Sequence, residues 1–397
     1  MNNLEITFLG SFYPKDRYKE ILEKSAYLDF AGNALQWSLI NGFNIIGCSI
    51  NAITVPATKR FKGFYLNDSS FSHNGISLDY CVGFGDIKGL KHIHTSFKIR
   101  NILVNSIKRP KYLFIYSIQN NLLRAACFFK KKYPETKIIL LVTDLSENMS
   151  ESTNLIYRTF KNIEIHENKK FIELVDGFIL LSKYMKDRIH LKNKPYIVME
   201  GIFNPDDEVF NNQYYKENKT RKILYTGTLA KRYGIMNLVE SFHSINNEDI
   251  ELIIVGDGDS KKDIVSLTLI DSRIKYLGVL DRSKVLQLQK VAQLLVNPRT
   301  PEGNYVKYSF PSKTMEYLAS GTPTLMYKLP GIPNEYYDYC YTVKELGIES
   351  LTNAIQNVLS KSTDELDNFG KKARNFILTN KSPQAQCQKI IDFIKTI

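Results

Sequence analysis

Short apolar segments alternate with longer amphipathic segments along both halves of the 397-residue chain. In the first half the apolar segments are residues 6–10, 44–48, 80–83, 112–116, 137–142, 177–181 and 196–199. In the second half they are residues 222–225, 252–255, 274–277, 294–296, 324–327 and 340–343. Apolar strands that alternate with helices are typical of parallel sheets covered by helices. We therefore expect an α/β protein with two Rossmann-like domains facing a cleft.

A polar segment rich in asparagine separates the two halves. Residues 204–221, NPDDEVFNNQYYKENKTR, contain few aliphatic side chains, which is typical of a linker between domains. We predict one domain over residues 1–205 and a second over 206–380. A last helix, within residues 381–397, is long enough to cross back and pack on the first domain.

The net charge limits the kinds of partner that the chain is expected to bind. The 53 Lys and Arg residues exceed the 41 Asp and Glu residues, so the formal net charge is +12. This excess attracts a phosphorylated substrate, an anionic membrane or a nucleic acid, although charge scattered over the surface explains it equally well. No aromatic–basic pattern or zinc-finger spacing accompanies the charge, so we expect no nucleic-acid partner.

Cysteine spacing and hydropathy exclude further classes of protein. The five cysteines are dispersed, without metal-ligand spacing, as is typical of reduced thiols in a cytoplasmic protein. The first residues, MNNLEITFLG, lack the regions of a signal peptide, and the chain has no apolar run of about eighteen residues. We expect a cytoplasmic protein whose contact with a membrane, if any, is peripheral.

A predicted helix over residues 89–107 carries basic side chains around an apolar stripe. The basic residues are Lys88, Lys91, Lys98, Arg100 and Lys108, and the stripe consists of Leu90, Ile93, Phe97 and Ile102. Such a helix can lie on an anionic membrane. The stripe can instead pack on the sheet, as in most amphipathic helices, and we favour that interpretation.

The segment that follows the strand ending at Val296 is the strongest candidate for a binding site. It reads NPRTPEGNYVKYSFPSKTMEYLASG, in which a helix is expected to begin near Pro311 and end at Gly321. Free N–H groups at the start of this helix, next to Lys313, suit a phosphate group. Glu316 lies about one turn further along and can reach hydroxyl groups. A nucleotide sugar carries both phosphate and hydroxyl groups. A helix that merely caps a strand explains the pattern equally well.

Candidate sites in the first half lie at strand ends and at a helix start. Gly10 ends the first strand, where the backbone can approach a ligand closely. Gly32 and Asn33 are expected to begin the next helix, and Asn33 can be a plain N-cap there. Asp144 follows the strand 137–142, at the edge where parallel sheets bind ligands, but it can equally cap the next segment.

Four segments of the second half occur in a defined order, and together they resemble glycosyltransferase family 4. They are ILYTGTLAKRYGIMNLVESF, ELIIVGDGD, YLGVLDRSKVLQLQKVAQLLVNP and SFPSKTMEYLASGTP. Four ordered matches across about a hundred residues are far more specific than one glycine-rich loop. The resemblance implies the GT-B fold. In the first half it is limited to Gly10, Gly32 and the pair Thr143-Asp144.

The resemblance implies a retaining, metal-independent hexosyltransferase whose donor is a nucleotide diphosphate sugar, with a UDP-sugar favoured. The nucleotide sugar is then a substrate, and no cofactor is expected. The implied catalytic residues are Asp144, Lys231, Arg232 and Glu316. The implied donor-binding residues are Gly10, Gly227, Thr228, Gly256, Asp257, Tyr308, Ser309, Phe310, Pro311, Ser312 and Lys313. Gly32 and Asn33 are implied on the acceptor side.

Each implied residue has an expected role. Glu316 is expected to bind ribose or sugar hydroxyls, and the diphosphate to lie between residues 309–312 and Lys231 or Arg232. These cations would stabilise the leaving nucleoside diphosphate in place of a metal.

The chain departs from the family pattern at several positions. The family usually has two glutamates eight positions apart, but here Tyr308 stands eight positions before Glu316, and Glu302 is an alternative source of the carboxylate. Thr228 occupies a position where arginine is common. Thr143 precedes Asp144 where the family often has histidine. The contacts to the donor sugar therefore stay open.

We predict a glycosyltransferase of surface-polysaccharide assembly, such as that of a capsule or exopolysaccharide. Its acceptor would be a glycan or a lipid-linked sugar, and it would touch the cytoplasmic face of an anionic membrane. One alternative is a GT-B epimerase or phosphorylase acting on a soluble sugar. Another is a non-catalytic partner subunit, which Tyr308 and the missing histidine suggest.

Overall fold

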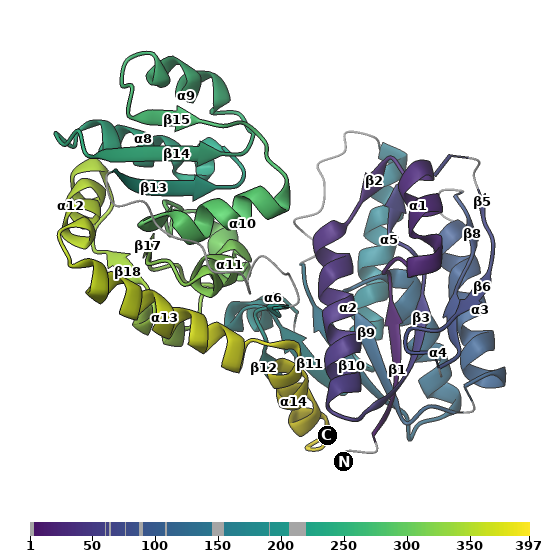
Figure 1. Cartoon of the computed structure of the whole chain (residues 1–397). Helices are drawn as coiled ribbons and strands as arrows, with labels where there is room; N and C mark the ends of the chain where they lie inside the picture. Colours follow the sequence, from purple (N-terminus) through teal and green to yellow (C-terminus); the bar gives the residue numbers. More distant parts are fainter. Residues whose placement is uncertain are drawn as a thin grey trace. The chain divides into compact units, whose positions relative to one another are not determined.

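The computed structural model describes residues 4–59, 61–62, 65–75, 77–86, 90–107, 109–144, 155–189, 191–205 and 220–397. The chain divides into two compact units (Figure 1). Unit 1 comprises Met1–Ile202 and Pro383–Ile397, and unit 2 comprises Phe203–Ser382. Most of the predicted linker lies outside the described residues. The expectation of an α/β fold is confirmed for each unit.

Unit 1 is built on an eight-stranded sheet whose strands are parallel except for the pair β6–β7. In spatial order the strands are β12 (Tyr196–Val198), β11 (Gly177–Leu180), β10 (Lys137–Val142), β9 (Tyr112–Tyr116), β1 (Glu5–Gly10), β3 (Ser49–Thr54), β7 (Asp79–Cys81) and β6 (Ser69–Phe71). The central strands β9 and β10 are buried on both faces, as their uninterrupted apolar sequences require.

Helices cover both faces of this sheet (Figure 1). The helices α2 (Phe30–Ile45) and α14 (Pro383–Ile394) pack on one face and share a core that includes Phe43 and Ile390. The other face is covered by α3 (Leu90–Asn105), α4 (Asn120–Lys132) and α5 (Leu155–Ile172). The shorter helices are α1 (Tyr18–Lys24) and α6 (Lys186–Ile189). No helix of the described ranges is both long enough and apolar enough to span a bilayer.

The strand predicted over residues 44–48 is wrong. Helix α2 continues through Gly42 to Ile45, and β3 begins only at Ser49. Gly42 does not end the helix because it lies where α14 approaches. A Cβ atom on Gly42 would lie 2.5 Å from the carbonyl oxygen of Pro383 and 2.6 Å from Sγ of Cys387. The glycine is therefore explained by close helix packing.

The interpretation of Asn33 as a helix cap is also wrong. The N-cap of α2 is Asp29, whose carboxylate accepts a hydrogen bond of 2.8 Å from the N–H group of Gly32. Asn33 is the fourth residue of the helix, and its Oδ1 accepts a hydrogen bond of 2.8 Å from the backbone N–H of Tyr13. Asn33 thus links the helix to the loop that follows β1.

The preferred interpretation of α3, with its apolar stripe packed on the sheet, is wrong as well. Leu90, Ile93 and Phe97 are 59, 40 and 51% exposed, respectively. The buried side of the helix consists instead of Thr95, Ser96, Ile99 and Leu103. The two inward hydroxyls are satisfied within the helix, because they donate to the carbonyls of Lys91 and Ile93 at 2.7 Å each.

Unit 2 contains a six-stranded parallel sheet. In spatial order its strands are β15 (Ile274–Tyr276), β14 (Ile250–Val255), β13 (Arg221–Thr226), β16 (Leu294–Asn297), β17 (Thr324–Tyr327) and β18 (Tyr341–Val343). Its helices are α8 (Ile235–His243), α9 (Lys261–Thr268), α10 (Arg282–Val291), α11 (Lys313–Ser320), α12 (Ile348–Leu359) and α13 (Thr363–Asn380). The cap predicted at Gly321 is confirmed, since this residue is left-handed with φ of 79°.

We expect Gly42→Val to destabilise unit 1 by about 2 kcal/mol, because the added carbons would force α14 away from α2. Thermal unfolding followed by circular dichroism, and limited proteolysis near Pro383, measure this effect. The control is Asn41→Val, which places the same side chain at the neighbouring exposed position of α2. Equal melting temperatures for the two variants would show that Gly42 is not needed for the packing of α14.

Candidate functional site

Two glycine turns interlock at the carboxyl ends of β13 and β14. Gly227 and Gly256 have φ angles of 133° and 140°, which favour glycine. The N–H groups of Gly227 and Leu229 donate to the carbonyls of Val255 and Asp257, both at 2.9 Å. A Cβ atom on Gly256 would overlap the carbonyl oxygen of Gly227. The predicted residues 227, 228, 256 and 257 are therefore held together at one edge of the sheet.

The ammonium group of Lys313 points at the Gly227 turn from the start of α11. Its Nζ lies 4.0 Å from the centre of the Tyr225 ring and occupies the space that a side chain on residue 227 would need. Within the described part of the chain, this Nζ makes no hydrogen bond and no ion pair. An anion bound next to it would offset the cost of burying the charge.

The surroundings of Lys313 alter its protonation. Burial lowers the pKa of Lys313 to about 7, Glu316 opposes this shift, and the positive charge of Arg299 adds to it. Near neutral pH the free protein is therefore divided between the ammonium and the neutral amine. An arriving phosphate favours the ammonium form.

The carboxylate of Glu316 is fixed by two donors from α10. Oε2 accepts from Arg282 and Oε1 accepts from Nε2 of Gln289, both at 2.7 Å. Gln289 is fully buried and also donates to the hydroxyl of Thr226 at 3.2 Å. Glu316 is three positions after Lys313, so both side chains emerge from the same side of α11. The lone pairs left on the carboxylate can accept hydrogen bonds from sugar hydroxyls.

Arg299 is a candidate that the sequence analysis missed. Its guanidinium lies 5.2 Å from the Tyr233 ring and 5.0 Å from the Tyr305 ring. It donates to Oγ of Ser309 at 3.1 Å, while its buried Nε has no partner among the described residues. The sequence could have indicated Arg299 by its position two residues after β16, at the carboxyl edge of the sheet.

The cations predicted to meet the diphosphate, Lys231 and Arg232, lie on the outer side of the Gly227 loop. Nζ of Lys231 pairs with Asp263 of α9 at 3.0 Å, and its side chain is 64% exposed. The guanidinium of Arg232 lies 5.1 Å from the Tyr233 ring. Their contact with a phosphate stays a prediction, and Lys313 is more enclosed than either.

The remaining donor-side residues form the approach to α11. The carbonyl of Pro311 accepts the first hydrogen bond of the helix, from Thr314 at 2.9 Å, and Ser312 is exposed just before it. The ring of Phe310 packs 5.3 Å from that of Tyr336, in the core of unit 2. This packing fixes the entry to the helix.

Tyr308 and Glu302 are the two candidates to replace the first glutamate of the family pattern, and they differ in their exposure. Tyr308 ends a 3-10 turn over Asn304–Tyr308 and is partly buried. Glu302 is exposed and accepts a hydrogen bond of 3.4 Å from Thr300. The question of which one faces a donor sugar stays open.

The candidate residues of unit 1 lie near the carboxyl edge of its sheet. A Cβ atom on Gly32 would overlap the carboxylate of Asp29 and lie 2.8 Å from the Tyr116 hydroxyl. Desolvation, followed by repulsion from Asp29, raises the pKa of Asp144. The sequence analysis missed Asp29, although aspartate before an apolar helix is a known cap signal.

Packing within unit 1 explains why residue 10 is a glycine. A Cβ atom there would lie 2.5 Å from Oε1 of Gln36, which accepts a hydrogen bond of 2.7 Å from the N–H of Ser11. Gln119 donates to the Ser11 hydroxyl at 2.9 Å. Close packing on α2 therefore explains the glycine, and its contact with a donor stays a prediction.

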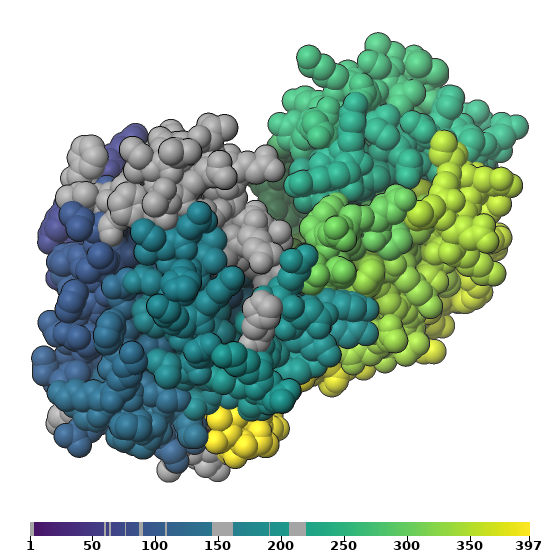
Figure 2. All heavy atoms as spheres, turned by 180° about the vertical axis from the view of Figure 1, so that it is seen from behind, coloured from purple at the N-terminus to yellow at the C-terminus, as the bar shows by residue number. Residues whose placement is uncertain are grey.

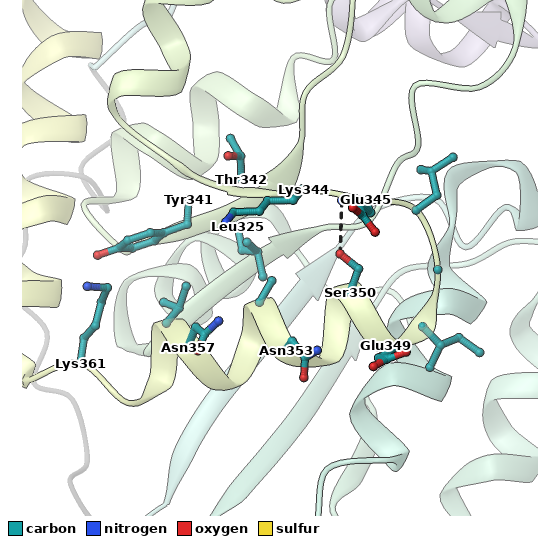
Figure 3. A pocket seen from close by; sticks show the side chains of 15 residues that line it. Leu325, Tyr341, Thr342, Lys344, Glu345, Glu349, Ser350, Asn353, Asn357 and Lys361 are labelled. Atoms are coloured by element: carbon teal, nitrogen blue, oxygen red, sulfur yellow. Dashed lines mark hydrogen bonds between the residues drawn. The ribbon is translucent and has the colours of Figure 1, made fainter.

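A pocket of about 660 Å³ lies elsewhere in unit 2, along β18 and α12 (Figure 3). Its labelled lining includes Tyr341, Lys344, Asn353 and Asn357, and the N–H of Glu345 donates to Oγ of Ser350 at 3.2 Å. None of the predicted donor residues lines it. In the described residues, no three His, Cys, Asp or Glu side chains gather as metal ligands would.

Comparison with solved structures identifies the class of fold. Sucrose-phosphate synthase from Thermosynechococcus elongatus is 13% identical, with a TM-score of 0.64 and 99% of each chain covered. HepE from Anabaena, solved in complex with UDP, is 12% identical, with a TM-score of 0.65 over 99% of this chain and 100% of that one. The chain has the GT-B fold, with two Rossmann-like units.

Sequence comparison relates unit 2 to a known family. Residues 206–376 match the model described as Glycosyl transferases group 1. Alpha-monoglucosyldiacylglycerol synthase of Streptococcus pneumoniae is 23% identical over 240 residues, which are 52% of this chain and 53% of that protein. The match thus spans about half the length of this curated relative.

We expect the affinity for UDP to fall as the pH rises above about 7. The free protein then loses the Lys313 proton, whereas the bound diphosphate needs the ammonium form. The dissociation constant should rise up to about tenfold per pH unit above the pKa. Isothermal titration calorimetry from about pH 6.5 to about pH 8.5 measures it. Lys313→Arg should remove this dependence, because arginine stays protonated.

The stability of the nucleotide-free protein provides the control. The pKa of Lys313 is lower in the folded than in the unfolded chain, so the unfolded chain binds more protons from about pH 7 to about pH 10.5. The contribution of Lys313 to stability therefore rises with pH across this range. Lys313→Met should raise the melting temperature at pH 7 by a few degrees while abolishing UDP binding. A wild-type UDP affinity that does not change with pH would contradict the assignment.

We expect Gln289→Met to lower the kcat/KM of sugar transfer about tenfold, because Glu316 loses the donor that orients it. Initial rates at varied donor concentration measure the loss. Gln287→Met is the matched control, since Gln287 is an exposed residue of the same helix. Equal rates for both variants would show that Gln289 only stabilises the core.

Proposed function

We propose that the protein is a retaining glycosyltransferase that moves a hexose from a nucleotide diphosphate sugar, with a UDP-sugar favoured. The acceptor is a glycan or a lipid-linked sugar of surface-polysaccharide assembly. The chemistry uses no metal ion and no other cofactor. The protein works in the cytoplasm at the membrane face, and nucleic acid is not a partner.

The contact between Lys313 and the Gly227 turn is the observation that supports this proposal most strongly. It combines a buried cation that makes no ion pair among the described residues, a glycine turn and the start of α11. These are the elements that a diphosphate needs. Glu316, three residues further, is fixed with its remaining lone pairs available for hydroxyl groups.

The same groups suit the departure of a nucleoside diphosphate. As the bond between sugar and phosphate breaks, negative charge grows on the phosphate oxygens, and Lys313 and the N–H groups at the start of α11 can stabilise it. Arg299 adds a second cation near Lys313. The sugar carbon gains oxocarbenium character, as in other glycoside chemistry.

The relatives also support a nucleotide-sugar donor. HepE was solved with UDP and, in a second structure, with UDP-glucose. The curated relative is named as a synthase of a glucosylated diacylglycerol, which favours an acceptor at a lipid surface. Asp144 and Asp29, at the carboxyl edge of unit 1, are the carboxylates proposed to position an acceptor hydroxyl.

We expect the purified chain to consume at least one member of a panel of nucleotide sugars, with UDP-sugars preferred. Mass spectrometry with and without membrane lipid extract measures donor loss and product. Glu316→Ala should lower kcat/KM at least about a hundredfold, because it removes a contact to the donor hydroxyls. The melting temperature should change little.

The control is Glu248→Ala, at an exposed glutamate of unit 2, which should leave turnover unchanged. Consumption of a donor without any acceptor, with a rearranged sugar as the product, would indicate an epimerase instead. Failure to bind UDP or GDP, with no effect of Glu316→Ala, would overturn the proposal and favour a non-catalytic subunit.

A further inference from the structure

The two enclosed cations of the candidate site in unit 2 lie against tyrosine rings. Nζ of Lys313 lies 4.0 Å from the centre of the Tyr225 ring. The guanidinium of Arg299 lies 5.2 Å from the centre of the Tyr233 ring and 5.0 Å from that of Tyr305. Neither cation makes an ion pair with any residue that the structure describes. Aromatic rings are therefore their closest partners.

Other cations of unit 2 are paired with carboxylates. Lys231 pairs with Asp263 at 3.0 Å, and Arg273 pairs with Asp271 at 2.7 Å. A carboxylate cancels the charge of the cation that it binds, whereas a neutral ring attracts the cation and leaves the net charge in place. The segments concerned, residues 225–313, form the green part of unit 2 in Figure 2.

The Tyr225 ring is held firmly beside the glycine turn. Tyr225 is 1% exposed near the end of β13, and its hydroxyl donates to the carbonyl of Thr228 at 2.7 Å. A second ring, that of the fully buried Tyr317, lies 5.9 Å from Nζ of Lys313. The Tyr317 hydroxyl accepts a hydrogen bond of 2.8 Å from the N–H of Thr226. Both rings are thus fixed by the backbone that forms the turn.

The rings beside Arg299 come from two separate 3-10 turns, one containing Tyr233 and the other containing Tyr305. The Tyr305 hydroxyl donates to the carbonyl of Arg232 at 3.3 Å, which joins the two turns. The guanidinium of Arg299 also donates to the hydroxyl of Ser309 at 3.1 Å, and this partner is neutral as well. The contacts that orient Arg299 therefore leave its charge uncompensated.

We propose that tyrosine rings position the anion-binding cations of unit 2 without neutralising them. Tyr225 holds Lys313. Tyr233 and Tyr305 hold Arg299. A carboxylate in place of a ring would compete with an arriving phosphate for the same cation, and an unheld side chain would lose more rotamer freedom on binding. The inference rests on the proposed function only in naming a nucleoside diphosphate as the anion.

The pKa of Lys313 tests the Tyr225 contact without a ligand. Carbon-13 NMR of the lysine Cε atoms measures it, and Lys313→Arg identifies the resonance. Because the ring stabilises the ammonium form, Tyr225→Leu should lower this pKa by about one pH unit, and Tyr225→Phe should leave it unchanged. The other charged groups that act on Lys313, Glu316 of α11 and Arg299 after β16, are the same in all these variants. An unchanged or higher pKa in Tyr225→Leu would overturn the role of Tyr225.

A double-mutant cycle tests the contact with Arg299 at a residue outside the core, since Tyr305 is only partly buried. Tyr305→Leu should raise the Kd for UDP about fivefold, as measured by isothermal titration calorimetry. In the Arg299→Met background the same change should have no further effect, because the ring then has no cation to hold. Losses that add in the double variant would overturn the role of Tyr305.

The matched control is Tyr341→Leu in the same unit. Nζ of Lys361 lies 5.8 Å from the Tyr341 ring, but Lys361 is already paired with Glu365. This variant should bind UDP as the wild type does. An equal loss in Tyr341→Leu and Tyr305→Leu would overturn the positioning role, because the loss would then come from general destabilisation.

Inorganic pyrophosphate separates this inference from the proposed function. The same cations should bind it more weakly than UDP, and Tyr225→Leu and Tyr305→Leu should weaken both anions alike. Pyrophosphate binding that depends on the tyrosines, without affinity for UDP, would contradict the proposed function and leave the positioning role intact. UDP binding that both tyrosine variants leave unchanged would overturn the positioning role alone. No binding of either anion would overturn both.

Discussion

A lysine ammonium group that makes no ion pair among the described residues, packed against a glycine turn, is the constraint on which the site in unit 2 depends. Gly227 must lack a side chain because its φ of 133° is strained for other residues, and Gly256 must lack one because a Cβ atom there would overlap the Gly227 carbonyl. The sheet supplies this geometry by ending β13 and β14 at adjacent positions. An ordinary core would not retain a desolvated cation, because it opposes folding. Its presence is explained if an anion completes the site.

The residues that hold the Glu316 carboxylate in place are different from the group that would bind to it. Its carboxylate is held by Gln289 and Arg282, which come from a different helix, so its direction does not depend on a ligand. Gln289 in turn is fixed by Thr226 at the end of β13. A preorganised acceptor of this kind loses little freedom when a hydroxyl group arrives. These hydrogen bonds therefore connect the sheet of unit 2, through Thr226 and Gln289, to the carboxylate that is proposed to bind the donor.

The sequence predicts the elements whose signals are uninterrupted and misses those whose signals depend on packing. The strands β9, β10 and β17 agree with prediction at both ends, because apolar residues fill them and polar residues flank them. The boundary between α2 and β3 was missed because Gly42 looks like a helix end, whereas α14, more than 300 residues later, requires it. Likewise, Lys231 and Lys313 are equally basic in sequence. Only the fold shows that the first is paired and exposed and that the second is enclosed.

Helix α3 is the clearest case in which composition misleads about orientation. Three of its apolar residues, Leu90, Ile93 and Phe97, lie on the exposed side, and the inward positions include two hydroxyl residues. This inversion has a low energetic cost, because Thr95 and Ser96 donate to carbonyls of their own helix, so neither hydroxyl is left unsatisfied. The exposed apolar side is not compensated within the described chain, and burial against another phase would compensate it.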